Sequence, residues 1–326
     1  MFLKSSALNF GWRVGCLWRV IFGVEYDYME INTLEHYLQF GLFTNPGLYL
    51  EKLKKDLPSD IKEIGLLLRK QIIHRVTLKN GNTGSNKDLR YGDMTKVSWW
   101  RQPEDDILPT AAAMLAELYR RNPMGFVAYR KEEDRLILTC RFVAILMASI
   151  LKSKGVPARV RSGFAPYFDI PAFGDKSVDH WINQYWDEGR SRWVTIDVDG
   201  SLEGYYKFDP YDIPDGVFDF SSDAWLAIRN GKVDGKHFWN AGGYDGLVVV
   251  AWELFYDFHC LMNNEIIYLH TPEMTKLANF EQITKVQLGE IDNLARLMQN
   301  PDKNFEGLKK LWETKKEFRL LKGALI

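Results

Sequence analysis

Residues 139–164 read TCRFVAILMASILKSKGVPARVRSGF, and the order of patterns within this stretch decides the fold that we expect. Residues 140–154 place apolar side chains at helical spacing, and Gly155 follows as a C-terminal stop. The pattern then changes to the alternation of a β-strand over residues 156–168. The stretch therefore predicts a helix that leads directly into a sheet.

Two further strands are expected downstream, in residues 180–187 (HWINQYWD) and 192–199 (RWVTIDVD). A hairpin-like turn at residues 187–189 separates them, so they are expected to be antiparallel neighbours. The order is helix, strand, strand, strand. It predicts an α+β fold in which the helix packs on an antiparallel sheet.

Cys140 opens the expected helix, directly after the strand-like segment LILT (136–139). The N-terminus of a helix carries partial positive charge and unpaired N–H groups, which lower the pKa of a thiol and can hold an oxyanion. Taken alone, a cysteine in such an apolar helix is more often a buried structural residue. The position of Cys140 therefore indicates a nucleophile only if other catalytic groups accompany it.

His180 begins the second expected strand and Asp197 ends the third. A thiol nucleophile needs a base within hydrogen-bond reach, and the base needs a third group that fixes its tautomer. Neighbouring antiparallel strands can supply the last two groups, and a helix end packed on the sheet can supply the thiol. We therefore predict a triad of Cys140 as nucleophile, His180 as base and Asp197 as orienting acid.

The same segments resemble a known family. TCRFVAIL, KSKGVPARVRSGF, VDHW and RWVTID are similar to the core motifs of the transglutaminase-like cysteine superfamily. Segments outside the core resemble a bacterial subgroup of transglutaminase-domain proteins, so that the resemblance covers roughly residues 38–320. It implies a papain-like, transglutaminase-like core with helical N- and C-terminal flanks, and a Cys-His-Asp triad on Cys140, His180 and Asp197.

Two positions depart from the family pattern. Phe142 stands where typical members have an aspartate, and Leu138-Thr139 stand where they often have glycine or cysteine. Related enzymes place a helper donor for the oxyanion about 40 residues upstream of the cysteine, which here suggests one of three residues: Trp99, Trp100 and Gln102. Candidates for lining the cleft are the neighbours of the expected nucleophile and base: Arg141, Asp179 and Trp181.

The rest of the chain is expected to be mostly helical. Helices are predicted over residues 35–41, 61–76 and 109–121, and residues 79–88 (KNGNTGSNKD) are expected to form a surface loop. We expect one compact domain over residues 1–326, which consists of three parts: a helical N-terminal flank (1–95), the catalytic core (96–205) and a mostly helical C-terminal flank (206–326).

Composition excludes several other classes of protein. Hydrophobic residues make up 46% and charged residues 26%, and the formal net charge is −1, which argues against a nucleic-acid or membrane partner. The three cysteines form no CxxC pair, and the histidines do not have metal-ligand spacing with one another, so no metal or organic cofactor is expected. No stretch is apolar enough to span a membrane, and we expect a cytoplasmic protein.

Other acidic or thiol motifs have simpler explanations. His259-Cys260 lies in an apolar helix, which favours packing. Asp197-Val198-Asp199-Gly200 lacks the further ligands of a calcium loop. The acidic residues between 209 and 219 are expected to be solvated.

Three functions remain open at this point. Attack of Cys140 on a peptide or amide substrate would give a thioester, which water then hydrolyses. Alternatively, an amine acceptor takes the acyl group in a transamidation, or the fold has lost activity and serves as a binding protein or scaffold. The residues do not show which acceptor reaches the thioester, and the resemblance to small bacterial relatives favours hydrolysis. The sequence does not indicate the oligomeric state.

Overall fold

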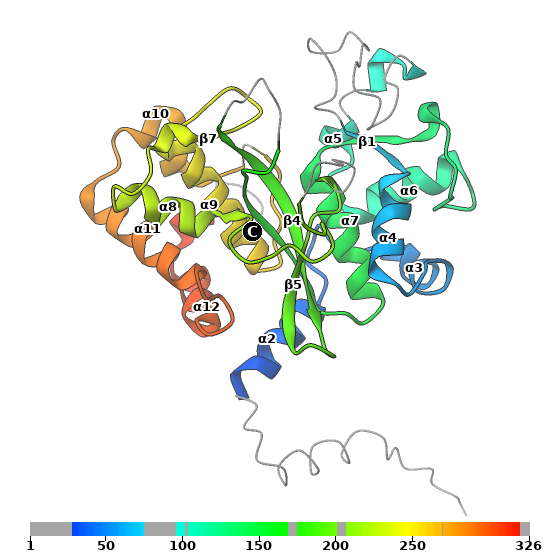
Figure 1. Cartoon of the computed structure of the whole chain (residues 1–326), viewed down its shortest axis with the longest axis horizontal. Helices are drawn as coiled ribbons and strands as arrows, with labels where there is room; N and C mark the ends of the chain where they lie inside the picture. Colours follow the sequence, from blue (N-terminus) through cyan, green and yellow to red (C-terminus); the bar gives the residue numbers. More distant parts are fainter. Residues whose placement is uncertain are drawn as a thin grey trace, which may run out of the picture.

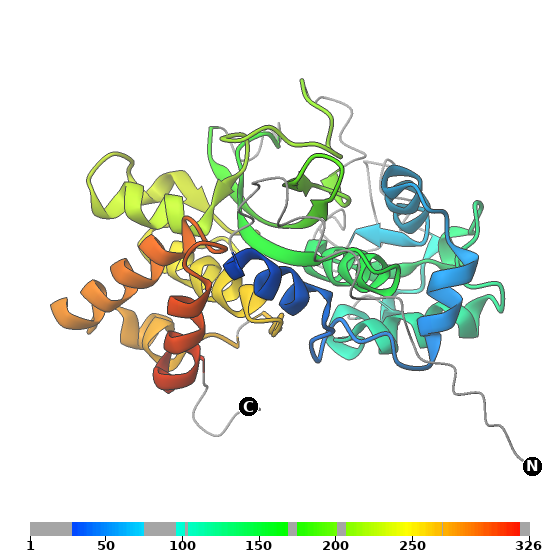
Figure 2. The same ribbon diagram turned by 90° about the horizontal axis from the view of Figure 1, so that it is seen from below.

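A curled sheet lies at the centre of the fold, between two groups of helices (Figures 1 and 2). The computed structural model describes residues 28–74, 96–101, 104–168, 175–200, 207–268 and 270–319. In the sheet, strands follow the order β5-β4-β3-β6, all pairs antiparallel, and β7 adds a parallel pairing to the start of β4. Its strands are β3 (Ala158–Ala165), β4 (Ser177–Asp187), β5 (Arg192–Ile196), β6 (Asp219–Phe220) and β7 (Phe238–Trp239). The protein is thus a mixed α+β fold with a mainly antiparallel sheet.

The helix α7 (Cys140–Ser153) packs against β3 and β4 and is buried along its whole length. Three further helices cover its other side, so the apolar residues around its entire circumference are all accommodated. Gly155 ends the segment with a φ of +78°, a conformation that glycine adopts without steric cost. The three helices that pack on α7 are α3 (Leu50–Asp56), α4 (Ile61–Arg69) and α6 (Ala111–Arg121), and the short helix α5 (Glu104–Ile107) belongs to the same group.

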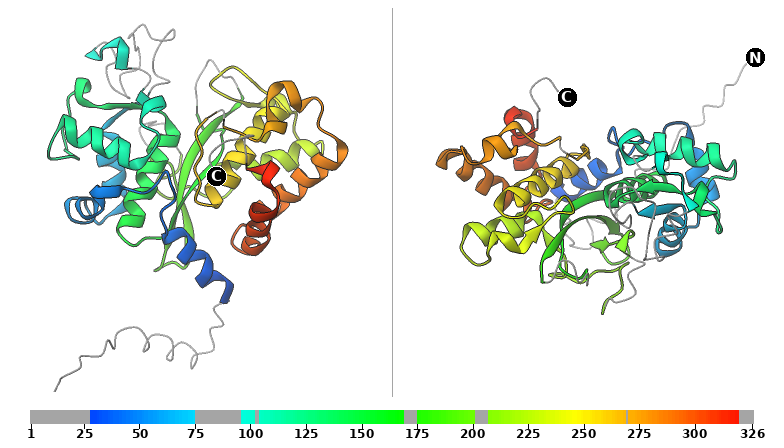
Figure 3. Two further views of the ribbon diagram at one scale, coloured as in Figure 1. Left: turned by 180° about the vertical axis from the view of Figure 1, so that it is seen from behind. Right: turned by 90° about the horizontal axis from the view of Figure 1, so that it is seen from above.

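A second group of helices covers the opposite side of the sheet, as the view from behind also shows (Figure 3). Its central member is α9, which packs on β3 and is largely apolar. The group consists of α8 (Ser221–Arg229), α9 (Leu247–Leu261), α10 (Leu277–Phe280), α11 (Lys285–Met298) and α12 (Phe305–Thr314), and α2 (Tyr28–Leu38) lies beside it.

This second layer explains why β3 is buried at all eight positions although it alternates in polarity. Val160 belongs to the core around α7. Arg161, on the alternate face, forms a buried ion pair with Asp257 of α9, with Nε 2.7 Å from Oδ1. A strand whose polar face is buried needs a partner for every charge, and α9 supplies one here.

Most of the expected elements are confirmed. The helix at 140–154, the strands that flank it, and the helix at 109–121 are present with ends shifted by a few residues. Asp60 caps α4, with its side chain accepting from the Glu63 N–H. The loop at 79–88 lies outside the described residues. No described helix is both long and apolar enough to cross a membrane.

The helix predicted over residues 61–76 is wrong in its second half. The helix α4 ends at Arg69, and residues Ile72–His74 form β1, which pairs in parallel with β2 (Leu136–Leu138). The apolar spacing of this segment suits either structure, and pairing with a distant strand decides between them. The helix predicted at 35–41 likewise lies further upstream, because α2 ends at Leu38.

A close contact at Gly163 offers a test of the sheet. Gly163 pairs with His180 on one side and with Phe220 on the other. A β-carbon at this position would lie 2.3 Å from the carbonyl oxygen of Asp219. We expect Gly163→Ala to lower the free energy of unfolding by about 1–3 kcal/mol, because β6 must move away. Urea denaturation measures this change.

Gly289→Ala is the matched control, because a β-carbon there meets nothing within 4 Å and the residue is in the helix α11. This control should be neutral or slightly stabilising. Equal unfolding curves for Gly163→Ala and the unaltered protein would show that β6 does not approach β3 as described.

Candidate functional site

Cys140 is the first residue of α7, at the point where β2 passes into the helix. Its exposed fraction is 9%, so the thiol is almost enclosed. The side chain of the N-cap residue, Thr139, makes no capping hydrogen bond to the helix. The first N–H groups of a helix have no partner within it and carry its positive end, which favours an anion at this position.

His180 lies on β4 and Asp197 directly follows β5, and the two side chains are neighbours. The His180 Nε2 atom is 3.0 Å from Asp197 Oδ1. The carboxylate of Asp197 also accepts from the Gly200 N–H at 2.7 Å and from the Tyr167 hydroxyl at 2.9 Å. Since Asp197 occupies Nε2, the ring nitrogen left for the thiol is Nδ1. His180 lies close enough to Cys140 to lower the pKa of its thiol, so the structure brings all three predicted residues together.

A second histidine also reaches the thiol. His74, the last residue of β1, pairs with Leu138, two residues before Cys140, and lies close enough to the thiol to lower its pKa. Its Nε2 atom lies 3.0 Å from Asp199 Oδ2. Arg69 in turn lies with Nε 3.3 Å from Asp199 Oδ1 and donates to the Asp199 backbone carbonyl at 3.1 Å. The thiol is therefore flanked by two imidazoles, each backed by its own buried carboxylate. Sequence reasoning missed this second pair.

The charges at the site favour a thiolate. Burial alone would raise the pKa of the Cys140 thiol, but hydrogen bonds from His180 and His74, and their charges, outweigh it and lower that pKa. Burial would lower the pKa of His180, but the charge of Asp197 outweighs it and holds that pKa well above its usual value. Both shifts favour the ion pair of thiolate and imidazolium over the neutral pair.

Burial and neighbouring charges also oppose each other in the second pair, His74 and Asp199. Burial would lower the pKa of His74, whereas the charge of Asp199 raises it to about 9. Burial would raise the pKa of Asp199, but the charges of His74 and Arg69 lower it well below the usual range. His74 is therefore a cation at neutral pH.

Tyr268 covers the thiol from the loop that follows α9. Its hydroxyl lies 3.5 Å from Cys140 Sγ, and it accepts a hydrogen bond of 3.3 Å from the Thr139 hydroxyl. Arg141 holds this loop in place by donating to the carbonyl of Ile266 at 2.8 Å and to the carbonyl of Glu265. The sequence carries no motif that would have indicated Tyr268.

The three expected cleft residues have different positions. Arg141 has an exposed fraction of 0% and Trp181 of 1%, so neither faces solvent. Instead, both pack behind the site: the Trp181 ring meets Tyr268 edge-on, with centroids 5.9 Å apart. Asp179 is half-buried and accepts from the Ala241 N–H at 3.0 Å, and burial raises its pKa to about 6.

Phe142, the departure from the family pattern, lies beneath the same tyrosine. Its ring is 1% exposed and meets Tyr268 edge-on, with centroids 6.4 Å apart. The aromatic side chain at this position thus supports the residue that covers the thiol. Neither His180 nor His74 has residue 142 among the partners described above, so phenylalanine in place of the family's aspartate takes no charged partner from either histidine.

The expected oxyanion donors find no support among the described side chains. Trp100 is 64% exposed, whereas the thiol is buried. Gln102 and the side chain of Trp99 lie outside the described residues. The side-chain donors that the structure does place at Cys140 are His180, His74 and Tyr268.

The packing role expected for His259 and Cys260 is confirmed. Both side chains are fully buried in α9, and the His259 ring is hydrogen-bonded to backbone carbonyls of Phe255 and Arg319. Burial raises the pKa of the Cys260 thiol well above its usual value. Cys260 is therefore a natural contrast to Cys140 in any test of thiol reactivity.

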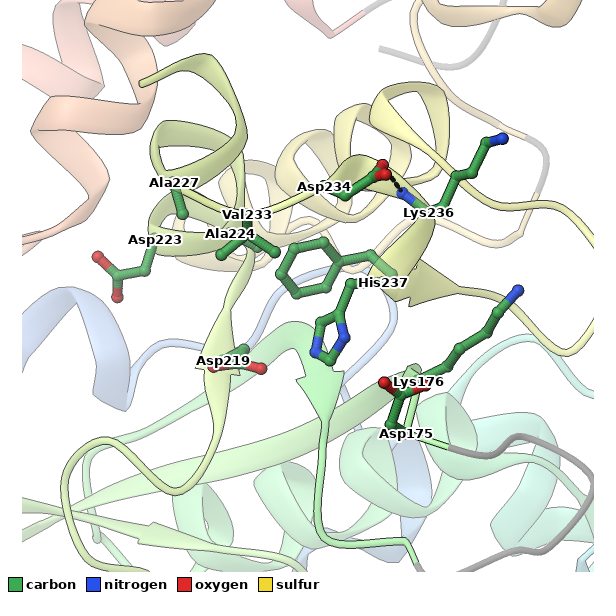
Figure 4. A pocket seen from close by; sticks show the side chains of 11 residues that line it. Asp175, Lys176, Asp219, Asp223, Ala224, Ala227, Val233, Asp234, Lys236 and His237 are labelled. Carbon is green, nitrogen blue, oxygen red and sulfur yellow. Dashed lines mark hydrogen bonds between the residues drawn. The ribbon is translucent and has the colours of Figure 1, made fainter. Parts of the chain in front are cut away.

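A cavity of about 620 Å³ lies elsewhere, beside α8, β6 and β7 (Figure 4). Asp219, Asp223 and Asp234 line it together with lysine and apolar side chains, but no member of the predicted triad does. Within the described part of the chain, no group of histidine, cysteine and acidic residues could hold a metal ion.

Comparison of the chain with protein-family models, curated proteins and solved structures found no match. The function must accordingly be inferred from the geometry of the site.

Thiol reactivity tests the charges at this site. Because the pKa of Cys140 is lowered, its thiolate should persist below the pKa of about 8.5 of a free thiol, and limiting iodoacetamide at about pH 6 should label it. Cys260 should stay unlabelled in the folded protein, because burial raises its pKa. Peptide mass mapping reads both sites in one sample.

His180→Ala should slow this labelling at pH 6 and move it to higher pH, because His74 alone then lowers the pKa of the thiol. Equal rates of labelling at Cys140 and Cys260 would contradict the charge arrangement.

Proposed function

We propose that this chain is an enzyme of the transglutaminase-like cysteine superfamily that cleaves a peptide or other amide through a thioester on Cys140. The observation that carries the proposal is the contact of the Cys140 thiol with His180, whose other ring nitrogen lies 3.0 Å from Asp197. Nucleophile, base and orienting acid stand in the order that thiol catalysis requires.

The proposed reaction begins with the thiolate of Cys140, because the proton already resides on His180. Attack on the amide carbonyl forms the C–S bond and moves the π pair to oxygen. Collapse restores the carbonyl and breaks the C–N bond, while the His180 imidazolium gives its proton to the departing amine. Neutral His180 then removes a proton from water, which attacks the thioester and releases the acid.

Asp197 supports both halves of this cycle. Its carboxylate is held by Gly200 and Tyr167 as well as by His180, so the imidazole has a fixed orientation. Its negative charge stabilises the imidazolium that faces the thiolate. Complete burial of Asp197 keeps water from competing for the same hydrogen bonds.

The fold agrees with the papain-like, transglutaminase-like core that the proposal includes. A helix that begins at the thiol packs on an antiparallel sheet, in which His180 lies on β4 and Asp197 directly follows the neighbouring strand β5. A reducing compartment suits an enzyme whose nucleophile is a free thiol, so we propose the cytoplasm as its location.

Turnover of an amide library tests the proposal. The intact protein should release amines from at least one peptide or amide class, and Cys140→Ala should abolish this release, because no other group replaces the thiolate. Cys260→Ala, on α9, is the matched control and should retain activity. Intact-mass spectrometry should detect the acyl group on Cys140, and a labelled amine added in excess shows whether water or an amine ends the reaction.

Asp197→Asn tests the triad separately. The substitution keeps the shape of the side chain but removes its charge and favours the wrong imidazole tautomer. We expect kcat to fall by about four orders of magnitude. Activity retained in Cys140→Ala would refute the mechanism, and an inert Cys140 throughout would indicate a binding protein.

A further inference from the structure

The second imidazole at Cys140 has no task in the cycle described above. His180 alone can take the proton of the thiol and return it to the leaving group. His74 nevertheless lies beside the same thiol, because it pairs with Leu138, two residues before Cys140, and it comes from a different sheet, the two-stranded pair of β1 and β2. It is held there by the carboxylate of Asp199, which Arg69 holds in turn.

The carbonyl oxygen of the substrate is the group that still needs a partner. During attack this oxygen gains a full negative charge, and it is bonded to the same carbon that binds the sulfur. A donor in hydrogen-bond contact with Sγ therefore needs only a small movement to reach it. Preorganised donors at this oxygen are commonly the largest single contribution to acyl-transfer catalysis.

We propose that His74 is a second catalytic imidazole, which donates a hydrogen bond to the carbonyl oxygen as Cys140 attacks. This inference rests on the proposed function, because it assigns a group to the same reaction. Asp199 and Arg69 are then positioning residues, since they act through His74.

The protonation of His74 suits this task. Asp199 occupies its Nε2 atom, so Nδ1 faces the thiol, and only the imidazolium form carries a proton on both nitrogens. Burial would lower the pKa of His74, but the carboxylate of Asp199 raises it to about 9, which keeps the donor form at neutral pH.

The exposed fractions of the two histidines also favour His74 as the donor to the carbonyl oxygen. Its side chain has an exposed fraction of 11%, whereas that of His180 has 3%. A substrate that approaches from solvent thus meets His74 before the more deeply buried base. The helix N-terminus at Cys140 adds its own N–H groups to the same oxygen.

The electrons balance without a further reactant. The thiolate pair forms the C–S bond, the π pair of the carbonyl moves to oxygen, and His74 stabilises that oxygen without giving up its proton. When the tetrahedral intermediate collapses, the pair returns to the carbonyl and the leaving group departs with the electrons of its bond.

Two reactions of the same thiol separate this role from thiolate activation. Iodoacetamide reacts by displacement at a saturated carbon and forms no oxyanion, whereas p-nitrophenyl acetate acylates the thiol through one. We compare the two rate constants at the same pH. If His74 binds the oxyanion, His74→Gln should lower the ratio of acylation to alkylation by about a hundredfold. A purely structural or pKa effect would lower both rates together and leave the ratio unchanged.

Asp199→Asn should lower the same ratio, because neutral His74 presents an acceptor to the oxygen, and it keeps the test available if His74→Gln does not fold. His237→Gln, beside the separate cavity, is the control and should leave the ratio unchanged. His180→Gln should slow both reactions in parallel. Near-UV circular dichroism establishes that every variant compared is folded.

The outcomes are distinct. The assignment would be overturned, with the triad intact, if His74→Gln left the ratio of acylation to alkylation unchanged. It would also be overturned if Tyr268→Phe lowered this ratio in its place. If Cys140 of the unaltered protein reacts with neither reagent faster than a free thiol, the proposed function itself fails, and the assignment of His74 fails with it.

Discussion

The buried turn that follows β5 is the constraint on which the rest of the site depends. Asp197 and Asp199 stand two residues apart in this turn, and each holds one of the two histidines that flank the thiol. Val198, between them, is 2% exposed and belongs to the core around α7. Its packing fixes the turn, and the two carboxylates on either side therefore have little freedom to move.

Buried charges of this kind are costly unless each has a partner, and the structure supplies partners in an ordered series. Arg69 lies against Asp199, which lies against His74, and His74 contacts Cys140. Asp197 and His180 approach the same thiol from the sheet. Cys140 thus stands where two networks meet, one anchored on α4 and the other on the central sheet.

Local patterns were sufficient to predict the central part of the fold. The helix from Cys140 and the strands after it carry strong periodicity, and their order brings His180 and Asp197 to the helix end. The proximity of the three residues could therefore be predicted, because they lie on consecutive elements.

The remaining contacts of the thiol depend on pairings that no local pattern encodes. His74 was assigned to the end of a helix, although it ends β1, and its place beside Cys140 follows from the parallel pairing with β2. Tyr268 reaches the thiol through a loop that Arg141 holds by backbone carbonyls, which leave no signature in the sequence. The partner of Asp199 is His74, more than a hundred positions away in the sequence, so no local motif indicates the pair.

The short pairing of β1 with β2 has a consequence for how this chain tolerates change. In the described register, His74 stands opposite Leu138, two residues before Cys140. Side chains alternate between the faces of a strand, so a slip of one residue would turn the imidazole away from the sulfur. A single deletion inside either strand would therefore remove the imidazole from the thiol without altering His74 itself.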